Sequence, residues 1–579
     1  MATLSLGNIY ALLQNKQTPG SLAKMVVIAS GLFFTPITMA GALWGYVRGY
    51  NRFIRGNGRP DMTNMPPIVV AGMVLFAVLT WVLLGLAVWF LKNAAEAMFT
   101  TQAATKGVLS YLGFNLVFSV LAFFIFKRWQ AKEHNIAIER GRHGSARIGT
   151  QADMLDLSEA PGLFIGGNMG YRKQGHILTV GSTRSGKGTS LIIPALLDRT
   201  ENLGSMVIID PKGENAAITG RYQKEKGMDV LLLDPWGVNT KQAATFNPMD
   251  ILKPGDELAD DAMMLAEMIV PDNPNDRDPF WANRARSIIA ALIMHLQPTG
   301  GTLIDLWRLL RLDPKEWIEL VAKMQVSDNE IISATGNEIE GMMANDKMFG
   351  SVMATALHHT DFLKSPALQR SLTKSSFNVN DLTKGSTVLY VIIPADKLKS
   401  HYQWLRLVVT TSIKATVRNH NLRVTFILDE FPSLGPLKEI SEFGMAAAAG
   451  FNITFWMIAQ SLPQLKNLYR DNWENFIANT SVRQYVGVND NFTAEYVSRS
   501  IGNETFHTYN KESGQPVNVT ARPLLTPDEV RAETEEMMII QVDRRPTVLC
   551  PKIPYLAMPD VAGHYDENPY HKGGASIAA

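Results

Sequence analysis

One short segment near residue 180 restricts the fold of this chain more than any other. An apolar run, Gly175-His-Ile-Leu-Thr-Val180, predicts a buried strand and leads directly into the glycine-rich sequence Gly181-Ser-Thr-Arg-Ser-Gly-Lys-Gly-Thr189. Residues 190–197 are again apolar and predict a buried helix. Glycines in this position let successive backbone N–H groups curve around phosphate oxygens, and the start of the helix adds its positive dipole end. The segment therefore predicts an α/β domain with a phosphate-binding loop.

The predicted nucleotide contacts are the residues of this loop: Gly181, Ser182, Thr183, Arg184, Ser185, Gly186, Lys187, Gly188 and Thr189. Lys187 is expected to bridge the β- and γ-phosphates of ATP. A Ser or Thr usually follows this lysine and reaches Mg²⁺ through its hydroxyl, but this chain has Gly188 there. Either Thr189 reaches the metal or water fills that position.

Hydrolysis at such a loop also requires carboxylates at the end of a neighbouring strand, one for Mg²⁺ or its waters and one to orient the attacking water. Three predicted strands end in aspartate, at Asp210, Asp234 and Asp429. Only Asp429 is followed by a second carboxylate, Glu430, so we assign this pair as catalytic and Asp429 also as a metal ligand. Asp210 and Asp234 each precede a proline, which is typical of a turn after a strand.

Another apolar strand, residues 451–458, ends close to Gln460. An amide at such a strand end can sense whether the γ-phosphate is intact, and we therefore include Gln460 among the catalytic candidates. A surface turn residue is the alternative. Between the two halves of the predicted sheet, residues 256–384 show helical periodicity instead, and the apolar run 386–393 predicts the return to the sheet.

The first 130 residues predict a membrane anchor. Residues 25–47, 68–91 and 107–126 contain no charged side chain and no histidine, and each approaches the length of about 20 residues that crosses a bilayer as a helix. Residues 25–47 include Pro36 and several glycines, so a position in the membrane interface is the alternative for that segment. A cleaved signal peptide fits poorly, because the first apolar run is too long and lacks a cleavage pattern.

Charges around these runs predict the orientation. The loop after the first run holds Arg48, Arg52, Arg55 and Arg59 against Asp61, and residues 127–147 are also rich in Lys and Arg. Because such loops face the cytoplasm, the large C-terminal part is expected inside the cell and residues 92–106 outside the inner membrane.

Overall composition excludes some classes of protein. Lys and Arg total 55 and Asp and Glu total 54, which argues against a broad basic face that coats nucleic acid, although a local basic channel stays possible. The single cysteine, Cys550, excludes an intramolecular disulfide framework and a Cys-rich zinc site.

Together these motifs resemble the type IV secretion coupling proteins, the TraG-like ATPases, over residues 142–555. The resemblance rests on the phosphate-binding loop and on further motifs: His143-Gly-Ser-Ala-Arg147, Asp210-Pro-Lys-Gly-Glu-Asn215, Phe246-Asn-Pro-Met-Asp250, Asp278-Pro-Phe-Trp281, Leu428-Asp-Glu-Phe-Pro-Ser-Leu-Gly435, Ile458-Ala-Gln-Ser-Leu462 and Arg522-Pro-Leu-Leu-Thr-Pro-Asp-Glu529.

That resemblance implies a RecA-like nucleotide-binding domain, residues 131–255 and 385–560, with an inserted all-α domain, residues 256–384. It also implies a homo-hexamer around a central channel, a catalytic role for Gln460, and a glycine at position 188 as an ordinary feature of the family. Residues 561–579 are expected to form a flexible tail. Two features depart from the pattern: three membrane spans rather than two, and no arginine in residues 431–460. Related DNA translocases place an arginine finger there, and Arg483 and Arg499 are the substitutes we name.

Three functions are compatible with these features. The first is an ATP-driven translocase of the bacterial inner membrane that feeds relaxase-bound single-stranded DNA into a conjugation channel, together with other secretion-system components. The second exports effector proteins. The third is a membrane receptor that docks substrates and uses ATP only as an assembly switch. The residues do not separate DNA cargo from protein cargo.

Overall fold

A nine-stranded sheet organises the part of the chain that the computed structural model describes, which comprises residues 144–158, 162–197, 204–272, 278–509 and 516–570. Its strand order is β13-β12-β9-β3-β8-β7-β4-β6-β5. The strands are β3 (His176–Gly181), β4 (Ser205–Asp210), β5 (Asp229–Leu233), β6 (Thr387–Ile392), β7 (Val424–Leu428), β8 (Ile453–Ala459), β9 (Thr480–Val486), β12 (Met537–Val542) and β13 (Val548–Pro551). From β9 to β5 all neighbours are parallel, whereas β12 and β13 are antiparallel additions.

Both faces of the sheet are buried, as expected for parallel strands that read as continuous apolar runs. In β4, Met206 and Ile208 belong to one hydrophobic cluster, while Val207 and Ile209 belong to another that extends into the helices between β5 and β6. Alternate side chains of a strand point to opposite faces, so each strand contributes to both clusters. The predicted α/β fold with a large parallel sheet is confirmed.

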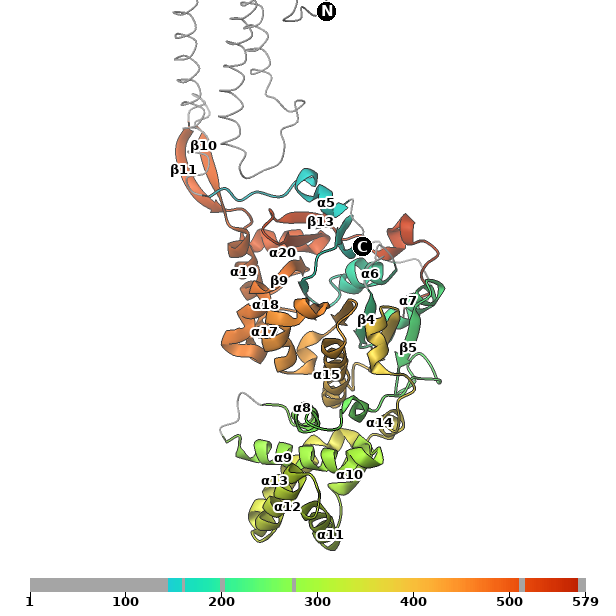
Figure 1. The fold of residues 1–579 in the computed structure, drawn as a ribbon. Helices are drawn as coiled ribbons and strands as arrows, with labels where there is room; N and C mark the ends of the chain where they lie inside the picture. Colours follow the sequence, from blue (N-terminus) through green and yellow to red (C-terminus); the bar gives the residue numbers. More distant parts are fainter. Residues whose placement is uncertain (1–143, 159–161, 198–203, 273–277, 510–515, 571–579) are drawn as a thin grey trace, which may run out of the picture. The chain divides into compact units, whose positions relative to one another are not determined.

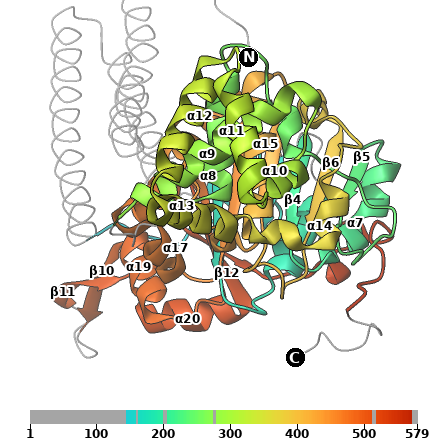
Figure 2. The same cartoon turned by 90° about the horizontal axis from the view of Figure 1, so that it is seen from below.

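Helices cover the sheet and form a separate region beside it (Figure 1, Figure 2). Between β5 and β6 the described residues form only helices and turns. These helices are α8 (Leu258–Ile269), α9 (Phe280–Leu296), α10 (Leu303–Leu309), α11 (Pro314–Gln325), α12 (Glu330–Met343), α13 (Asp346–His359) and α14 (Pro366–Ser371). Side-chain caps begin several of them: Thr302, Asp313 and Asn329 accept hydrogen bonds from first-turn N–H groups.

The remaining helices precede or follow strands along the chain. They are α5 (Leu155–Ser158), α6 (Ile193–Leu197), α7 (Glu214–Glu225), α15 (Tyr402–Arg418), α16 (Met445–Ala447), α17 (Leu462–Tyr469), α18 (Glu474–Ala478), α19 (Asn491–Ile501) and α20 (Pro527–Glu536). Two small antiparallel pairs lie apart from the main sheet: β1 (Leu163–Gly166) with β2 (Met169–Tyr171), and β10 (Asn503–Tyr509) with β11 (Pro516–Pro523).

Two predictions concern the ends of the chain. The three predicted membrane spans lie within residues 1–143, outside the described residues, and among the helices that the structure describes none combines the length and apolar character needed to cross a bilayer. Residues 561–570, which the sequence assigns to a flexible tail, lie against α7. There Arg221 donates to Asp566 at 2.7 Å and the ring of His564 stacks on Tyr222 at 4.3 Å between centroids.

A buried ion cluster joins the helical region to α15. Asp261 of α8 is fully buried, and both of its carboxylate oxygens accept hydrogen bonds from the Arg418 guanidinium, at 2.7 and 2.6 Å. Lys414 lies 3.3 Å from the same carboxylate. Because α15 also packs against the sheet, this cluster connects the helical region to the nucleotide-binding half of the fold.

Removal of the Asp261 carboxylate should destabilise the fold, because Arg418 then loses its buried partner and keeps only the exposed carboxylate of Glu257. We expect Asp261→Ala to lower the free energy of unfolding by about 3 kcal/mol. The matched control is Glu257→Ala, which removes an exposed carboxylate that contacts the same arginine, and its urea midpoint should stay close to that of the native chain. Tryptophan fluorescence during urea unfolding measures both, and equal midpoints for the two variants would contradict this account.

Candidate nucleotide site

The loop between β3 and the following helix has the backbone form of an anion-binding nest. It spans residues 182–187 and leads into a π-helical turn, η3 (Gly188–Ile192), which α6 continues. Arg184 and Gly186 have positive φ angles of 63° and 90°. Within the described residues, the N–H groups of Thr183, Arg184 and Gly186 have no hydrogen-bond acceptor. The loop therefore presents free backbone donors next to a helix N-terminus, the arrangement that binds phosphate.

A neighbouring strand end supports the loop from one side. After β9, the carbonyl of Gly487 accepts from the Ser182 N–H at 3.3 Å, and Asn489 donates to the Ser182 hydroxyl at 3.2 Å. Gly487 has φ 59°, and a Cβ atom there would lie 2.6 Å from the Ser185 Cβ. Only glycine allows this close approach, so the loop and the end of β9 form one packed unit.

Lys187 lies at the centre of the loop. Its ammonium group donates to the carbonyls of Gly181 and Ser182 at 2.6 and 2.7 Å. Burial lowers the pKa of Lys187, while the nearby Asp429 and Glu430 act in the opposite direction. The structure thus brings the predicted phosphate-binding lysine and the predicted catalytic carboxylates into one electrostatic environment.

Hydrogen bonds connect the loop to Glu430. Thr183 donates to the Gln460 side-chain oxygen at 3.4 Å, and the Gln460 amide donates to both oxygens of Glu430 at 3.1 and 3.0 Å. Gln460 directly follows β8, the strand that lies between β3 and β7. The strand order therefore places the amide between the loop and the carboxylate.

Glu430 has an unusual backbone. Its φ and ψ are 61° and 42°, in the left-handed region that residues other than glycine seldom adopt. The turn is held by Ser433, whose N–H and hydroxyl both donate to the Glu430 carbonyl, at 2.8 and 2.7 Å. Such conformations cost about 1–3 kcal/mol and concentrate at functional sites. The strain sets the direction in which the Glu430 side chain leaves the end of β7.

Asp429 is only partly exposed to solvent. Burial and the adjacent Glu430 charge raise the pKa of Asp429 to about 7, against the opposing effect of Lys187. Because this pKa already includes the effect of Lys187, a further cation such as a metal ion would be needed to keep Asp429 fully ionised near neutral pH.

The other two aspartates at strand ends have structural partners. Asp210 is buried and accepts from the Ala216 N–H at 2.8 Å, at the start of α7. Asp234 accepts from the N–H groups of Val238, Asn239 and Thr240 at 2.9, 2.7 and 3.1 Å. Both carboxylates therefore stabilise the turn that follows their strand, as the sequence predicts.

Gly188 and Thr189 follow Lys187, where related loops carry the hydroxyl that reaches Mg²⁺. The Thr189 hydroxyl donates to the Gly186 carbonyl at 3.3 Å, so it lies at the loop. A Cβ atom at Gly188 would meet nothing within 4 Å, which shows that steric crowding is not the reason for glycine at this position.

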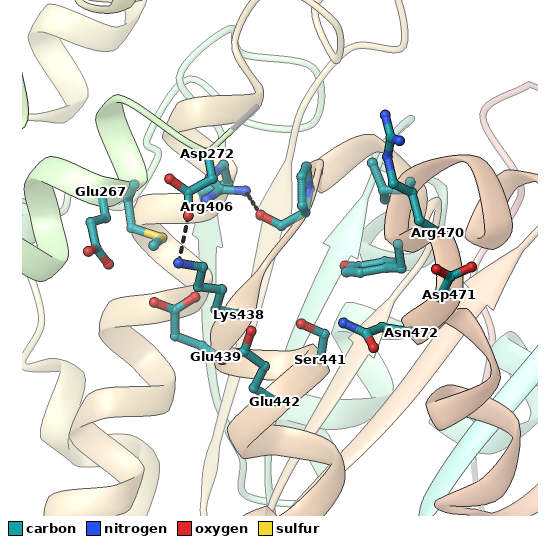
Figure 3. Close-up of a pocket in the computed structure, with 14 residues that line it drawn as sticks. Glu267, Asp272, Arg406, Lys438, Glu439, Ser441, Glu442, Arg470, Asp471 and Asn472 are labelled. Carbon is teal, nitrogen blue, oxygen red and sulfur yellow. Dashed lines mark hydrogen bonds and ion pairs between the residues drawn. The ribbon is translucent and has the colours of Figure 1, made fainter. Parts of the chain in front are cut away.

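A cavity of about 400 Å³ is lined by residues of 267–272, 436–442 and 468–472 together with Arg406, and by no residue of the phosphate-binding loop (Figure 3). Its charged walls include Glu267, Asp272, Lys438 and Glu439, and Asp272 pairs with Lys438 at 2.6 Å. Arg406 of α15 is 2% exposed and donates to the carbonyls of Leu434 and Pro436 at 3.0 and 2.5 Å. These bonds fix the segment that follows Glu430, so Arg406 acts on the site through the backbone.

Sequence reasoning missed Gly487, Asn489 and Arg406. Gly487 and Asn489 follow the strand that ends at Val486, and this strand is parallel to β3. Because the carboxyl ends of parallel strands lie at the same edge of a sheet, residues just after this strand could have been expected near the loop. Among the described residues neither named arginine has a hydrogen bond to the loop: Arg483 lies within β9, opposite Leu178 of β3, and Arg499 is exposed on α19. Within the described part of this single chain, neither arginine makes a hydrogen bond at the site of Lys187.

Fold and site together define an α/β P-loop protein with a RecA-like nucleotide-binding domain. In agreement, the fold is similar to solved structures of the bacterial conjugative coupling protein TrwB, with a TM-score of 0.56, 16% identity, and coverage of 70% of this chain and 92% of that one. Another similar structure is plasmid coupling protein TrwB in complex with ADP and Mg²⁺, with a TM-score of 0.55, 16% identity, and coverage of 71% and 94%.

The family is shown by a match of residues 132–573 to the model described as type IV secretory system conjugative DNA transfer, and the chain belongs to this family. Conjugal transfer protein TraG of Agrobacterium fabrum is 27% identical over 413 residues, 67% of this chain and 61% of the relative. Protein VirD4 of Rhizobium radiobacter is 26% identical over 414 residues, 68% and 59%. The chain thus spans about three fifths of the length of these relatives.

The raised pKa of Asp429 predicts that the stability of the fold depends on pH. Its folded pKa of about 7 lies above its ordinary value of 3.8, so its contribution to stability is complete below about pH 4 and is lost as the pH rises through 7. Asp429→Asn should therefore unfold at higher temperature than the native chain at pH 8, with a gain of about 4 kcal/mol, and show no gain at pH 4.

The control is Asp210→Asn. Burial also raises the pKa of Asp210, to about 6, but its carboxylate accepts N–H groups at the start of α7, and the substitution removes part of that acceptor. We expect no gain in melting temperature for this variant. Equal melting temperatures of Asp429→Asn and the native chain at pH 8 would contradict the predicted effect of burial.

Proposed function

We propose that this chain is a membrane-anchored ATPase coupling protein of a type IV secretion or conjugation system. In this role it recruits relaxase-bound single-stranded DNA, an effector protein, or both, and drives or licenses their transfer into the secretion channel. The observation that carries the proposal is the hydrogen-bonded connection from Thr183 through Gln460 to Glu430. Through Gln460, at the end of the intervening strand β8, the phosphate-binding loop is linked to the Glu430 carboxylate. Nucleotide binding in the loop is therefore coupled to the group that activates water.

ATP and Mg²⁺ fit the residues present, because the loop offers free N–H donors and an ammonium group, and the carboxylate pair supplies the oxygen ligands that Mg²⁺ prefers. Bound Mg²⁺·ATP would supply the phosphoryl group and neutralise its charge. Residues 181–189 would hold the phosphates, with Lys187 at the β- and γ-phosphates. Asp429 and Thr189 would hold the metal or its waters. Solved structures of the similar plasmid coupling protein TrwB, one in complex with ADP and Mg²⁺ and one with a non-hydrolysable ATP analogue, support this choice.

Glu430 would orient the attacking water and accept its proton. Gln460 holds the Glu430 carboxylate through both oxygens and reaches Thr183 in the loop, which suits a residue that reports the state of the γ-phosphate. The left-handed turn at Glu430 keeps the carboxylate in a fixed direction. In this arrangement the chain binds and hydrolyses ATP with residues from three adjacent strand ends.

Further parts of the proposal come from the sequence and the family. Residues 1–130 would anchor the chain in the bacterial inner membrane, with the large C-terminal part in the cytoplasm. Residues 131–255 and 385–560 would form the nucleotide-binding domain and residues 256–384 the all-α domain. The active form would be a homo-hexamer that works with other secretion-system components. An arginine finger, for which Arg483 and Arg499 remain candidates, would come from a neighbouring subunit.

The second candidate function is a receptor that docks substrates and uses ATP only as an assembly switch. The paired carboxylates favour hydrolysis over this alternative, because binding alone needs no water-activating group. A Glu430→Gln chain that binds ATP and still supports transfer at the normal rate would favour the switch.

Binding and hydrolysis should separate in two variants. Lys187→Ala removes the ammonium group, so ATP affinity and turnover should both fall. Glu430→Gln keeps the shape but removes the carboxylate, so ATP should still bind while turnover falls by about 10²–10⁴. Equilibrium binding of a fluorescent ATP analogue and steady-state phosphate release measure the two effects.

Asp234→Asn is the control for that comparison, because this carboxylate accepts only N–H groups of its own turn. It should retain most turnover. Near-normal hydrolysis by Glu430→Gln, together with a folded, ATP-binding and inactive Asp234→Asn, would show that the catalytic strand is wrongly assigned.

Membrane topology can be tested with single cysteines, because the native Cys550 is 5% exposed and should not react. Ala97→Cys lies in the predicted periplasmic loop and Asn57→Cys in the predicted cytoplasmic loop. An impermeant thiol reagent on intact cells should label the first and not the second. The reverse pattern would overturn the proposed orientation.

A further inference from the structure

Lys552 reaches the phosphate-binding loop from the C-terminal part of the chain. Its ammonium group lies 3.4 Å from the Ser185 carbonyl and 3.3 Å from the Thr534 carbonyl. Its backbone N–H donates to the Glu536 carbonyl at 3.1 Å, directly after the pairing of β13 with β12. The antiparallel addition to the sheet thus carries a cation to the loop.

The lysine lies on the opposite flank of the loop from the catalytic candidates. Strands β9, β12 and β13 lie on one side of β3, whereas β8 and β7, which end at Gln460 and Asp429, lie on the other. Lys552 follows β13 and contacts Ser185, while Thr183 contacts Gln460. A phosphate chain bound in the loop would therefore have Glu430 and Gln460 on one flank and Lys552 on the other.

Packing after β13 holds Lys552 in place. Tyr555, three residues later, is 2% exposed and belongs to a hydrophobic cluster with Ile193 and Leu197 of α6, the helix that continues from the loop. Val561 belongs to the same cluster. The backbone just after Lys552 is thus packed against the helix that follows the phosphate-binding loop.

The ammonium group of Lys552 has an incomplete set of partners. It contacts two neutral carbonyls, and among the described residues no carboxylate lies within ion-pair distance of it. The side chain is half-buried, and burial lowers the pKa of Lys552 although Glu535 and Glu536 oppose this effect. A partly desolvated cation beside free backbone N–H donors favours an anion as its partner.

We propose that Lys552 is a second cation of the nucleotide site and that it contacts the phosphates that are not transferred, the α- or β-phosphate. This inference rests on the proposed nucleotide binding. The γ-phosphate is assigned to the flank of Glu430 and Gln460, so Lys552 interacts equally with ADP and with ATP. An interaction that is the same before and during the chemical step changes KM and leaves kcat unaltered.

The test compares Lys552→Met, which removes the charge and keeps much of the length, with Lys552→Arg, which keeps the charge. Full-length protein is titrated with ADP and Mg²⁺ by calorimetry, and ATP turnover gives KM and kcat. Lys552→Met should raise Kd for ADP and KM for ATP by about tenfold, with kcat within about twofold, since a charge-assisted hydrogen bond is lost. Lys552→Arg should restore most of the affinity.

Lys224→Met is the matched control, because Lys224 is an exposed lysine of α7 and its removal changes net charge equally. It should leave Kd, KM and kcat unchanged. A tenfold loss of ADP affinity in this variant as well would overturn the proposal, because the effect would then come from net charge.

Lys187→Ala separates this inference from the proposed function. If Lys187→Ala weakens ADP binding and Lys552→Met does not, the role of Lys552 is wrong and the nucleotide site stands. If neither variant weakens binding, the nucleotide site itself is wrong. A simple structural role at the end of α20 would lower the melting temperature of Lys552→Met while leaving Kd unchanged, and that result would also overturn the proposal.

Discussion

Parallel pairing of three strands is the constraint on which the candidate site depends. In β3, β8 and β7, Val180 is opposite Ala459 and Leu428 is opposite Met457, so the three strands end at nearly the same level. One functional element therefore follows each strand at the same edge of the sheet: the phosphate-binding loop after β3, Gln460 after β8, and the Asp429–Glu430 pair after β7. A shift of one strand by a single residue would turn its side chains to the other face and separate these groups.

Local features of the sequence predicted the groups that lie at strand ends. Apolar runs located β3, β7 and β8, and the double carboxylate singled out Glu430 from the aspartates that cap their own turns. Contacts distant in sequence were not predictable in the same way. Lys552 meets Ser185 across 367 positions, and nothing in the residues around 552 indicates that an antiparallel strand will bring them there. The predicted helix at residues 190–197 begins earlier, as a π-helical turn from Gly188, and no side chain among the described residues caps its start.

Electrostatic balance explains how the site combines partly buried charges that would each be unfavourable alone. Burial raises the pKa of Asp429 and lowers that of Lys187, and each group partly offsets the effect on the other. The left-handed turn at Glu430 adds backbone strain at the same place. Arg406 and Ser433 hold the segment that follows, and Asp261 with Arg418 ties α15 to the helical region. Movement of the helical region would therefore reach the Glu430 turn through α15.

The most direct measurement is an experimental structure of the full-length chain with Mg²⁺ and a non-hydrolysable ATP analogue. The account predicts phosphate density in the loop of residues 182–187, with the Lys187 ammonium moved from the Gly181 and Ser182 carbonyls onto the β- and γ-phosphates. It also predicts Glu430 and Gln460 on the γ-phosphate side, and Mg²⁺ next to Asp429. Nucleotide density in the cavity beside Arg406, or an empty loop at saturating analogue, would contradict the assignment of the site.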